Sequence, residues 1–144
     1  MTFDIYSVDK GDEKQAQYEI VLGNYKENGP LITTHWTRGE YEKQWLEALS
    51  ALVEGDVNSC LLVTDIQPTT ISAGITYWVI FRKEDSIYFQ QRWKMNFAAF
   101  LIGPPSAVEK HIEPRIQGTL EEHSRVSEWR LPFNCLQQFV RMHH

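Results

Sequence analysis

The sequence contains little cysteine, no long apolar run and no excess of positive charge, and each shortage excludes a class of protein. Its two cysteines, Cys60 and Cys135, are too few for a disulfide framework, and both lie in apolar stretches, so we expect buried free thiols in a reducing compartment. The longest apolar run, FAAFLI, is too short to span a membrane. The first residues carry neither the positive start nor the apolar segment of a signal peptide. We therefore expect a soluble, cytoplasmic protein.

The charge of the chain is acidic and unevenly distributed. The formal net charge is -5, which disfavours long-range attraction to nucleic acids and other polyanions. Residues 1–70 carry five basic and twelve acidic side chains, whereas residues 71–144 carry nine basic and seven acidic ones. An acidic first half suits a basic protein partner better than it suits RNA or DNA.

The length of 144 residues favours one domain with a single core. The last two histidines resemble the start of a purification tag, so we expect the domain to comprise residues 1–142 and set residues 143–144 aside. The predicted elements follow the order strands, helix, several strands and two short helices. This order indicates an α+β fold, with an antiparallel sheet and helices packed on one side.

Strand patterns are spread over the whole chain. The turn-rich DKGDEK predicts a hairpin between the first two extended segments, and Asn28–Pro30 is expected to break the chain before the third. Both faces of residues 75–82 are largely apolar, so this strand is expected to be central. In the last segment we expect Glu128 to pair with Arg125 or Arg130. The extended segments are predicted at residues 3–8, 16–25, 31–36, 58–66, 75–82, 86–93 and 125–130.

One long helix and two short helices are predicted. The long helix begins after Thr37, where Glu40 completes a capping box, and ends at Gly55. A second capping box, formed by Ser106 and Glu109, is expected to open a short helix, and a closing helix is expected to have Pro132 in its first turn. The apolar side chains of the long helix form one stripe, which we interpret as core: Tyr41, Trp45, Leu46, Leu49, Leu52 and Val53.

The segment 77–97 interleaves aromatic rings with cations, which is the composition of a platform for single-stranded nucleic acid. Strand alternation turns Tyr77 and Trp78 toward the interior and leaves fewer rings exposed. The acids of the turn offset its two cations, so Arg92 and Lys94 remain as a small basic spot. A nucleic-acid-binding module is therefore the alternative function.

Motifs for catalysis, phosphate binding and metal binding are absent from the sequence. His35, His111 and His123 are scattered, and a metal-free ribonuclease site or a metal site would require the fold to bring histidines together. Glu121 and Glu122 are adjacent in an extended loop and point apart, so they do not form a carboxylate pair. We predict no enzyme activity, no cofactor and no metal.

Three stretches together resemble the immunity proteins of bacterial contact-dependent growth inhibition (CdiI proteins), in particular the group typified by the Enterobacter cloacae member. The first stretch has a Trp before a helix that contains a Tyr and then Trp-Leu. The second has a Trp-Val strand, an acidic turn and a Tyr-x-Gln strand. The third has an Ile and an Arg before a Val-Ser-Glu-Trp strand. The match extends over about residues 31–140. The matching residues are Trp36, Tyr41, Trp45, Leu46, Trp78, Val79, Glu84, Asp85, Tyr88, Gln90, Ile112, Arg115 and Val126 to Trp129.

The resemblance implies a Whirly-like α+β fold, with curved antiparallel sheets, one main helix and two shorter helices. It implies a protein that is not an enzyme and that binds the C-terminal toxin domain of its cognate CdiA effector in a 1:1 complex. The toxin is expected to be a nuclease, whose active site the immunity protein occludes.

Acidic loops and turns are the expected contacts, because carboxylates standing in for phosphates pair with the arginines and lysines of a nuclease cleft. Interface residues differ between members of such a family, so the resemblance itself does not identify them. The candidate toxin-binding residues are Glu54, Asp56, Asp65, Glu84, Asp85, Glu121 and Glu122.

Overall fold

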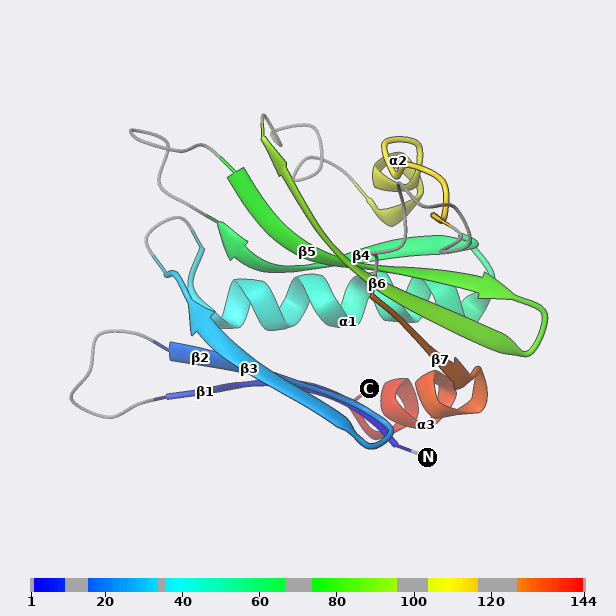
Figure 1. Cartoon of the computed structure of the whole chain (residues 1–144), viewed down its shortest axis with the longest axis horizontal. Coiled ribbons are helices and arrows are strands. Elements are labelled where there is room, and N and C mark those ends of the chain that lie inside the picture. Colours follow the sequence, from blue (N-terminus) through cyan, green and yellow to red (C-terminus); the bar gives the residue numbers. More distant parts are fainter. Residues whose placement is uncertain are drawn as a thin grey trace.

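The computed structural model describes residues 2–9, 16–33, 36–66, 74–95, 104–116 and 127–143. These residues form a three-stranded antiparallel sheet in the order β1-β2-β3, a four-stranded antiparallel sheet in the order β4-β5-β6-β7, and three helices (Figure 1). The elements are β1 Phe3–Val8, β2 Ala16–Leu22, β3 Tyr25–Leu31, α1 Arg38–Glu54, β4 Ser59–Ile66, β5 Gly74–Lys83, β6 Ser86–Met95, α2 Pro105–Glu109, β7 Glu128–Pro132 and α3 Asn134–His143.

The three-stranded sheet confirms the first predicted hairpin and corrects the prediction for its third strand. A tight turn at Gly23, with φ of 64°, ends β2 and starts β3, so the predicted single strand across this turn is wrong. The predicted break at Asn28–Pro30 is also wrong, because these residues lie within β3. As an edge strand, β3 tolerates Pro30 without losing a ladder hydrogen bond. Gly29 is required there because the Tyr18 ring lies 2.9 Å from where a Cβ would be.

The core lies between the two sheets and the helices. Strand β5 pairs with β4 on one side and β6 on the other, which confirms that it is central, and its Trp78 is fully buried. The Phe3 and Phe89 rings stack at 5.4 Å between the two sheets, and Trp129 stacks on Tyr25 at 4.5 Å. These aromatic contacts fix the three-stranded sheet against the inner face of the four-stranded one.

Helix α1 forms as its sequence predicts. Thr37 and Glu40 make the reciprocal capping box, Gly55 ends the helix, and the predicted apolar stripe is buried or half-buried. Two of its side chains also cover the outer edge of β4. The Gln44 amide donates to Leu61 O at 2.8 Å and accepts from Val63 N–H at 2.9 Å, and the Trp45 indole donates to Val63 O at 2.7 Å. The helix thereby satisfies backbone groups that an edge strand would otherwise leave open.

The two short helices differ from the prediction at their first residues. Helix α2 begins after Pro104 without a side-chain cap, so the second capping box is wrong. The Glu109 carboxylate instead accepts the N–H groups of Asn58 and Ser59, at 2.7 and 2.9 Å, which ties α2 to the start of β4. Pro132 ends the edge strand β7 rather than opening α3.

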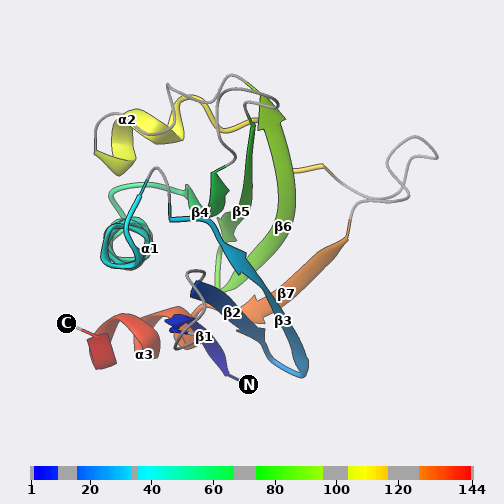
Figure 2. The ribbon, with the colours of Figure 1, turned by 90° about the vertical axis from the view of Figure 1, so that its left-hand side faces the viewer.

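The whole arrangement is the α+β fold that the sequence indicates, with one long helix and two shorter ones. Figure 2 shows the helices together on one side of the strands and the long strand β6 curving around the interior. The likeness to the Whirly fold and the domain boundary at residue 142 stay predictions. His143, the last residue of α3, lies with its ring 4.3 Å from that of Phe139.

Candidate functional site

Two connections that carry predicted acids lie at the same end of the molecule. Figure 1 shows the C-terminal end of α1 and the β5–β6 turn on the same side, where β4 begins. The Arg82 N–H donates to Asn58 O at 2.9 Å, which joins the α1–β4 connection to the end of β5. Their carboxylates form what we call the acidic end, made of Glu54, Asp56, Glu84 and Asp85.

The α1–β4 connection has a defined conformation. Gly55 adopts a left-handed φ of 85°, a conformation that glycine accepts at low cost, and the chain turns sharply after the helix. The Asp56 N–H donates to Ala51 O at 3.0 Å and completes this cap. The last turn of α1 contains no basic side chain, so the negative end of the helix dipole adds to the charge of Glu54 and Asp56.

The β5–β6 turn is anchored from two sides. The Phe133 N–H, between β7 and α3, donates to Asp85 O at 2.7 Å. The Arg82 guanidinium lies 3.7 Å over the Phe133 ring, and its Nε donates to Glu84 O at 3.2 Å. Because these contacts use backbone groups and Arg82, the exposed carboxylates of Glu84 and Asp85 are left to face solvent in a fixed place.

The acidic end carries more acids than cations. Its four acidic residues are exposed, whereas the two cations of the β5–β6 turn are the half-buried Arg82 and the exposed Lys83. Asp65 is not part of it. The backbone of Asp65 pairs with Thr76, at the opposite end of β4 from Ser59. Glu121 and Glu122 lie outside the described residues.

A polar cluster on β6 and β7 replaces the predicted pairing of Glu128. Both carboxylate oxygens of Glu128 accept from Arg115, each at 2.7 Å, and the fully buried Gln90 donates to the same carboxylate at 2.7 Å. The Arg115 hydrogen bonds hold the pKa of Glu128 below its usual range. Of the two predicted partners, Arg130 instead donates to Ser86 Oγ at 3.1 Å, and Arg125 lies outside the described residues. The cluster holds the segment before residue 116 against the four-stranded sheet.

Arg92 belongs to the same cluster, so the predicted basic spot is wrong for this residue. Its guanidinium donates to the backbone oxygens of Glu113 and Pro114 and to Gln90 Oε1, each at 2.8 Å. Burial lowers the pKa of Arg92. Tyr77 and Trp78 are buried, so this strand pair presents fewer rings than its composition suggests, although Trp93 is 55% exposed.

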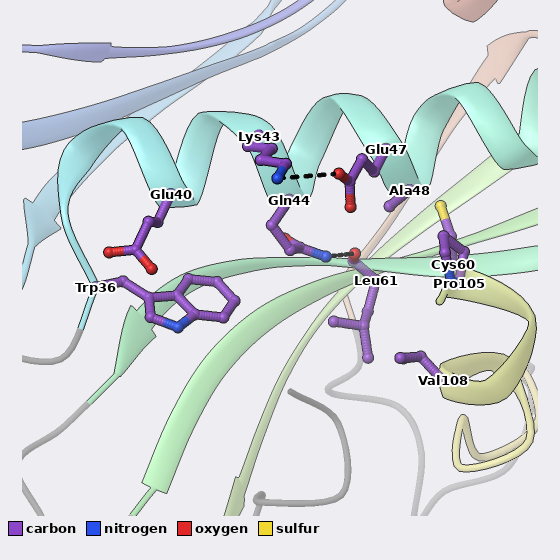
Figure 3. A pocket seen from close by; sticks show the side chains of 10 residues that line it. All are labelled: Trp36, Glu40, Lys43, Gln44, Glu47, Ala48, Cys60, Leu61, Pro105 and Val108. Atoms are coloured by element: carbon purple, nitrogen blue, oxygen red, sulfur yellow. Dashed lines mark hydrogen bonds and ion pairs between the residues drawn. The ribbon is translucent and has the colours of Figure 1, made fainter. Parts of the chain in front are cut away.

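A groove of about 320 Å³ lies between α1 and α2, beside the outer edge of β4 (Figure 3). Leu61, Val108 and Pro105 give it an apolar floor, and Trp36 lies at the end nearest the start of α1. The rim of the groove is formed by three exposed, charged side chains from successive turns of α1. Two of them are acidic and one is basic: Glu40, Lys43 and Glu47.

The residues of this groove are not arranged for nucleophilic catalysis. Burial raises the pKa of the Cys60 thiol, which makes it a poor nucleophile. Gln44, also in the groove, is engaged with the β4 backbone. Among the described residues, no group of three or more His, Cys, Asp or Glu is placed to hold a metal ion. His35 and His123 lie outside that part of the chain.

Comparison with known proteins identifies the family. The protein-family model of the CdiI N-terminal domain matches residues 31–139, which is most of the chain. The chain belongs to the CdiI family. This confirms the resemblance seen in the sequence. A comparison with curated protein sequences gave no match.

A solved structure shares the fold of this CdiI family member. It is the CdiA-CT/CdiI toxin and immunity complex from Enterobacter cloacae, and the match covers 98% of this chain and 97% of that chain, with a TM-score of 0.76 and 21% sequence identity. At this identity the likeness concerns the fold alone. Among the residues of this chain that the structure describes, no helix is long and apolar enough to span a membrane.

Sequence reasoning missed the groove and the Arg115–Glu128 pair. One signal for the groove is present in the sequence, because Glu40, Glu47 and Glu54 recur at seven-residue intervals and therefore share one face of α1. Arg115 and Glu128 both belong to the stretches that carry the family resemblance, but no pattern in the sequence pairs them, because Glu128 is brought close only by the pairing of β7 with β6.

Proposed function

We propose that this chain is an immunity protein that binds and neutralises the C-terminal toxin domain of its cognate CdiA effector. The observation that carries the proposal is the family match over residues 31–139. The similarity in fold to a chain of a solved toxin and immunity complex, over nearly the whole length of both chains, supports it. The protein acts by stoichiometric binding rather than by catalysis.

The toxin surface that it covers is basic and belongs to the active site of a nuclease. Four exposed carboxylates at one end of the molecule support this, since they can pair with the arginines and lysines that hold a nucleic-acid backbone. Anchored connections reduce the ordering cost of binding. Asp65, Glu121 and Glu122 remain candidates for further contacts.

The protein acts in the cytoplasm. The two cysteines, Cys60 and Cys135, are both buried and form no disulfide, which suits a reducing compartment. A nucleic-acid-binding module is the weaker alternative, because Arg92 is hydrogen-bonded within the protein and Tyr77 and Trp78 of β5 are buried.

Co-expression tests the proposal. Cells that express the C-terminal domain of the large exoprotein encoded beside this gene should stop growing, and co-expression of this chain should restore growth. The two proteins should co-purify in a 1:1 ratio. Binding of single-stranded oligonucleotides at physiological salt, with no protection and no complex, would favour the alternative instead.

Charge reversal tests the acidic end. The paired variants Glu54→Lys/Asp56→Lys and Glu84→Lys/Asp85→Lys should each weaken toxin binding by about tenfold or more, because like charges then face each other. A variant with Glu121→Lys/Glu122→Lys tests the remaining pair in the same assay. The matched control is Glu42→Lys, an exposed acid on α1 away from the acidic end. Unchanged affinity in the first two variants would remove the acidic end from the interface.

A further inference from the structure

The groove between α1 and α2 is large enough to hold one or two side chains of a binding partner. Its volume of about 320 Å³ is at the lower limit of the roughly 300–1,000 Å³ found for small-molecule sites. The floor is apolar and the rim is ionic, with Val108 and Leu61 below and Glu40 and Glu47 above. A long side chain with an apolar stem and a charged head fits this division.

The charge of the rim indicates which head group fits. Glu40, Glu47 and Glu54 lie on one face of α1 at seven-residue intervals, about 10 Å apart along the axis. The rim therefore leads from the start of α1 toward the acidic end. A partner segment that follows α1 would meet carboxylates at regular steps, and it must be basic to match them.

In the free protein, Lys43 itself places a positive charge beside Glu47 on the rim of the groove. Its Nζ lies 3.8 Å from Glu47 Oε1, with both side chains more than half exposed, at 75% and 57%. Such a pair on a helix contributes only about 0.2–0.5 kcal/mol, so a partner's cation displaces it at small cost. Glu40 is held more firmly, because its Oε1 accepts the Thr37 N–H at 3.1 Å as part of the capping box.

We propose that the α1–α2 groove receives a basic segment of the toxin domain, in addition to the contacts at the acidic end. A lysine or arginine of that segment places its stem against Leu61 and Val108 and its charged head at Glu47, and a second cation of the segment lies at Glu40, about two turns of α1 away. The cation at Glu47 thereby takes over the interaction that Lys43 makes in the free protein. This inference rests on the proposed function and extends the interface along α1.

The test measures the affinity of three variants for the same toxin domain, made inactive by a catalytic substitution. Glu47→Lys should weaken binding by about tenfold or more, because a cation then faces the incoming cation. Glu42→Lys makes the same charge change on the same helix but outside the groove, and should change affinity by less than about twofold. Lys43→Ala should tighten binding by about twofold or more, because the competing cation is gone.

The outcomes separate the two proposals. Weaker binding in Glu47→Lys with tighter binding in Lys43→Ala supports the groove, and the second result cannot come from a damaged fold. If the wild-type protein binds the toxin but Glu47→Lys behaves like Glu42→Lys, the groove is not part of the interface and the proposed function stands. If the wild-type protein binds no toxin domain, the proposed function itself is wrong.

Discussion

Glu128 is the residue whose charge contributes most clearly to the fold. Its side chain is 24% exposed and receives two hydrogen bonds from Arg115 and one from Gln90. Arg115 also covers the Tyr88 ring at 3.8 Å, so the ion pair closes over an aromatic side chain. These contacts fix the Arg115 side chain against β6 and β7.

Glu128→Gln should reduce the free energy of unfolding at pH 7 by about 1–2 kcal/mol, because a hydrogen-bonded charge is lost. Folding lowers the pKa of Glu128 from its usual 4.5, so the ionised carboxylate stabilises the fold fully at pH values above 4.5. The contribution is lost as the pH falls through the lowered pKa. Urea unfolding at several pH values should therefore show the two proteins converging in acid. A difference that stays constant from pH 7 to pH 3 would contradict this.

Glu84 has a conformation that its side chain disfavours. Its φ of 56° lies in the left-handed region, at the first position of the two-residue turn between β5 and β6, where glycine is preferred. Backbone strain of this kind is often found at functional sites. Glu84 is also one of the exposed acids of the acidic end.

Glu84→Gly should raise the free energy of unfolding by about 0.5–1 kcal/mol, since relief of the left-handed strain exceeds the entropic cost of glycine. The same variant should bind the toxin domain more weakly. Thermal unfolding and a binding titration on the same sample measure both effects. Asp85→Gly, in the same turn, is the control and should not be stabilised. A loss of stability in Glu84→Gly would show that the Glu84 side chain is needed for the turn.

At the scale of elements, α1 supplies what the edge strand β4 lacks. Gln44 bridges the carbonyl of Leu61 and the N–H of Val63 much as a neighbouring strand would. The α1–β4 contact therefore depends on one amide side chain as well as on apolar packing.

Gln44→Ala should lower the free energy of unfolding by about 1–2 kcal/mol, because two backbone groups lose their partner. The Val63 amide should exchange with solvent faster than in the wild-type protein. Gln138→Ala, on the exposed face of α3, is the matched control and should leave both properties unchanged. Equal exchange of Val63 in both variants would mean that solvent replaces Gln44 without cost.

Elements with strong local signals could be predicted from the sequence, and those that depend on neighbours could not. The caps of α1 and the central strand β5 are local features and were found. Strand β3 was missed because Gly29 and Pro30 indicate a break unless the strand is known to lie at an edge. The sequence predicts Glu109 as part of a helix cap, because nothing local indicates its partners Asn58 and Ser59, some fifty residues away.

The candidate site shows the same division. Each acid of the acidic end could be predicted as an exposed loop or turn residue. Their common location could not, because it depends on the hydrogen bonds from Arg82 to Asn58 and from Phe133 to Asp85. The groove likewise requires α2 to be placed beside α1, which the pattern of neither helix shows.

At the scale of the whole molecule, the net charge of -5 and the acidic end should make association with a basic toxin fast and dependent on salt. We expect the association rate constant to fall by about tenfold or more between 50 and 500 mM salt, with a smaller change in dissociation. Stopped-flow fluorescence with the inactive toxin domain measures both rates. An association rate that is independent of salt would contradict electrostatic steering.

Titration of the toxin's activity tests the immunity function most directly. The active toxin domain is incubated with increasing amounts of this protein, and the degradation of RNA and DNA is followed in a cell extract. We expect degradation of one of these substrates by the toxin alone, and its complete loss at one equivalent of the protein. Toxin activity that persists in the presence of excess protein would contradict the proposed function.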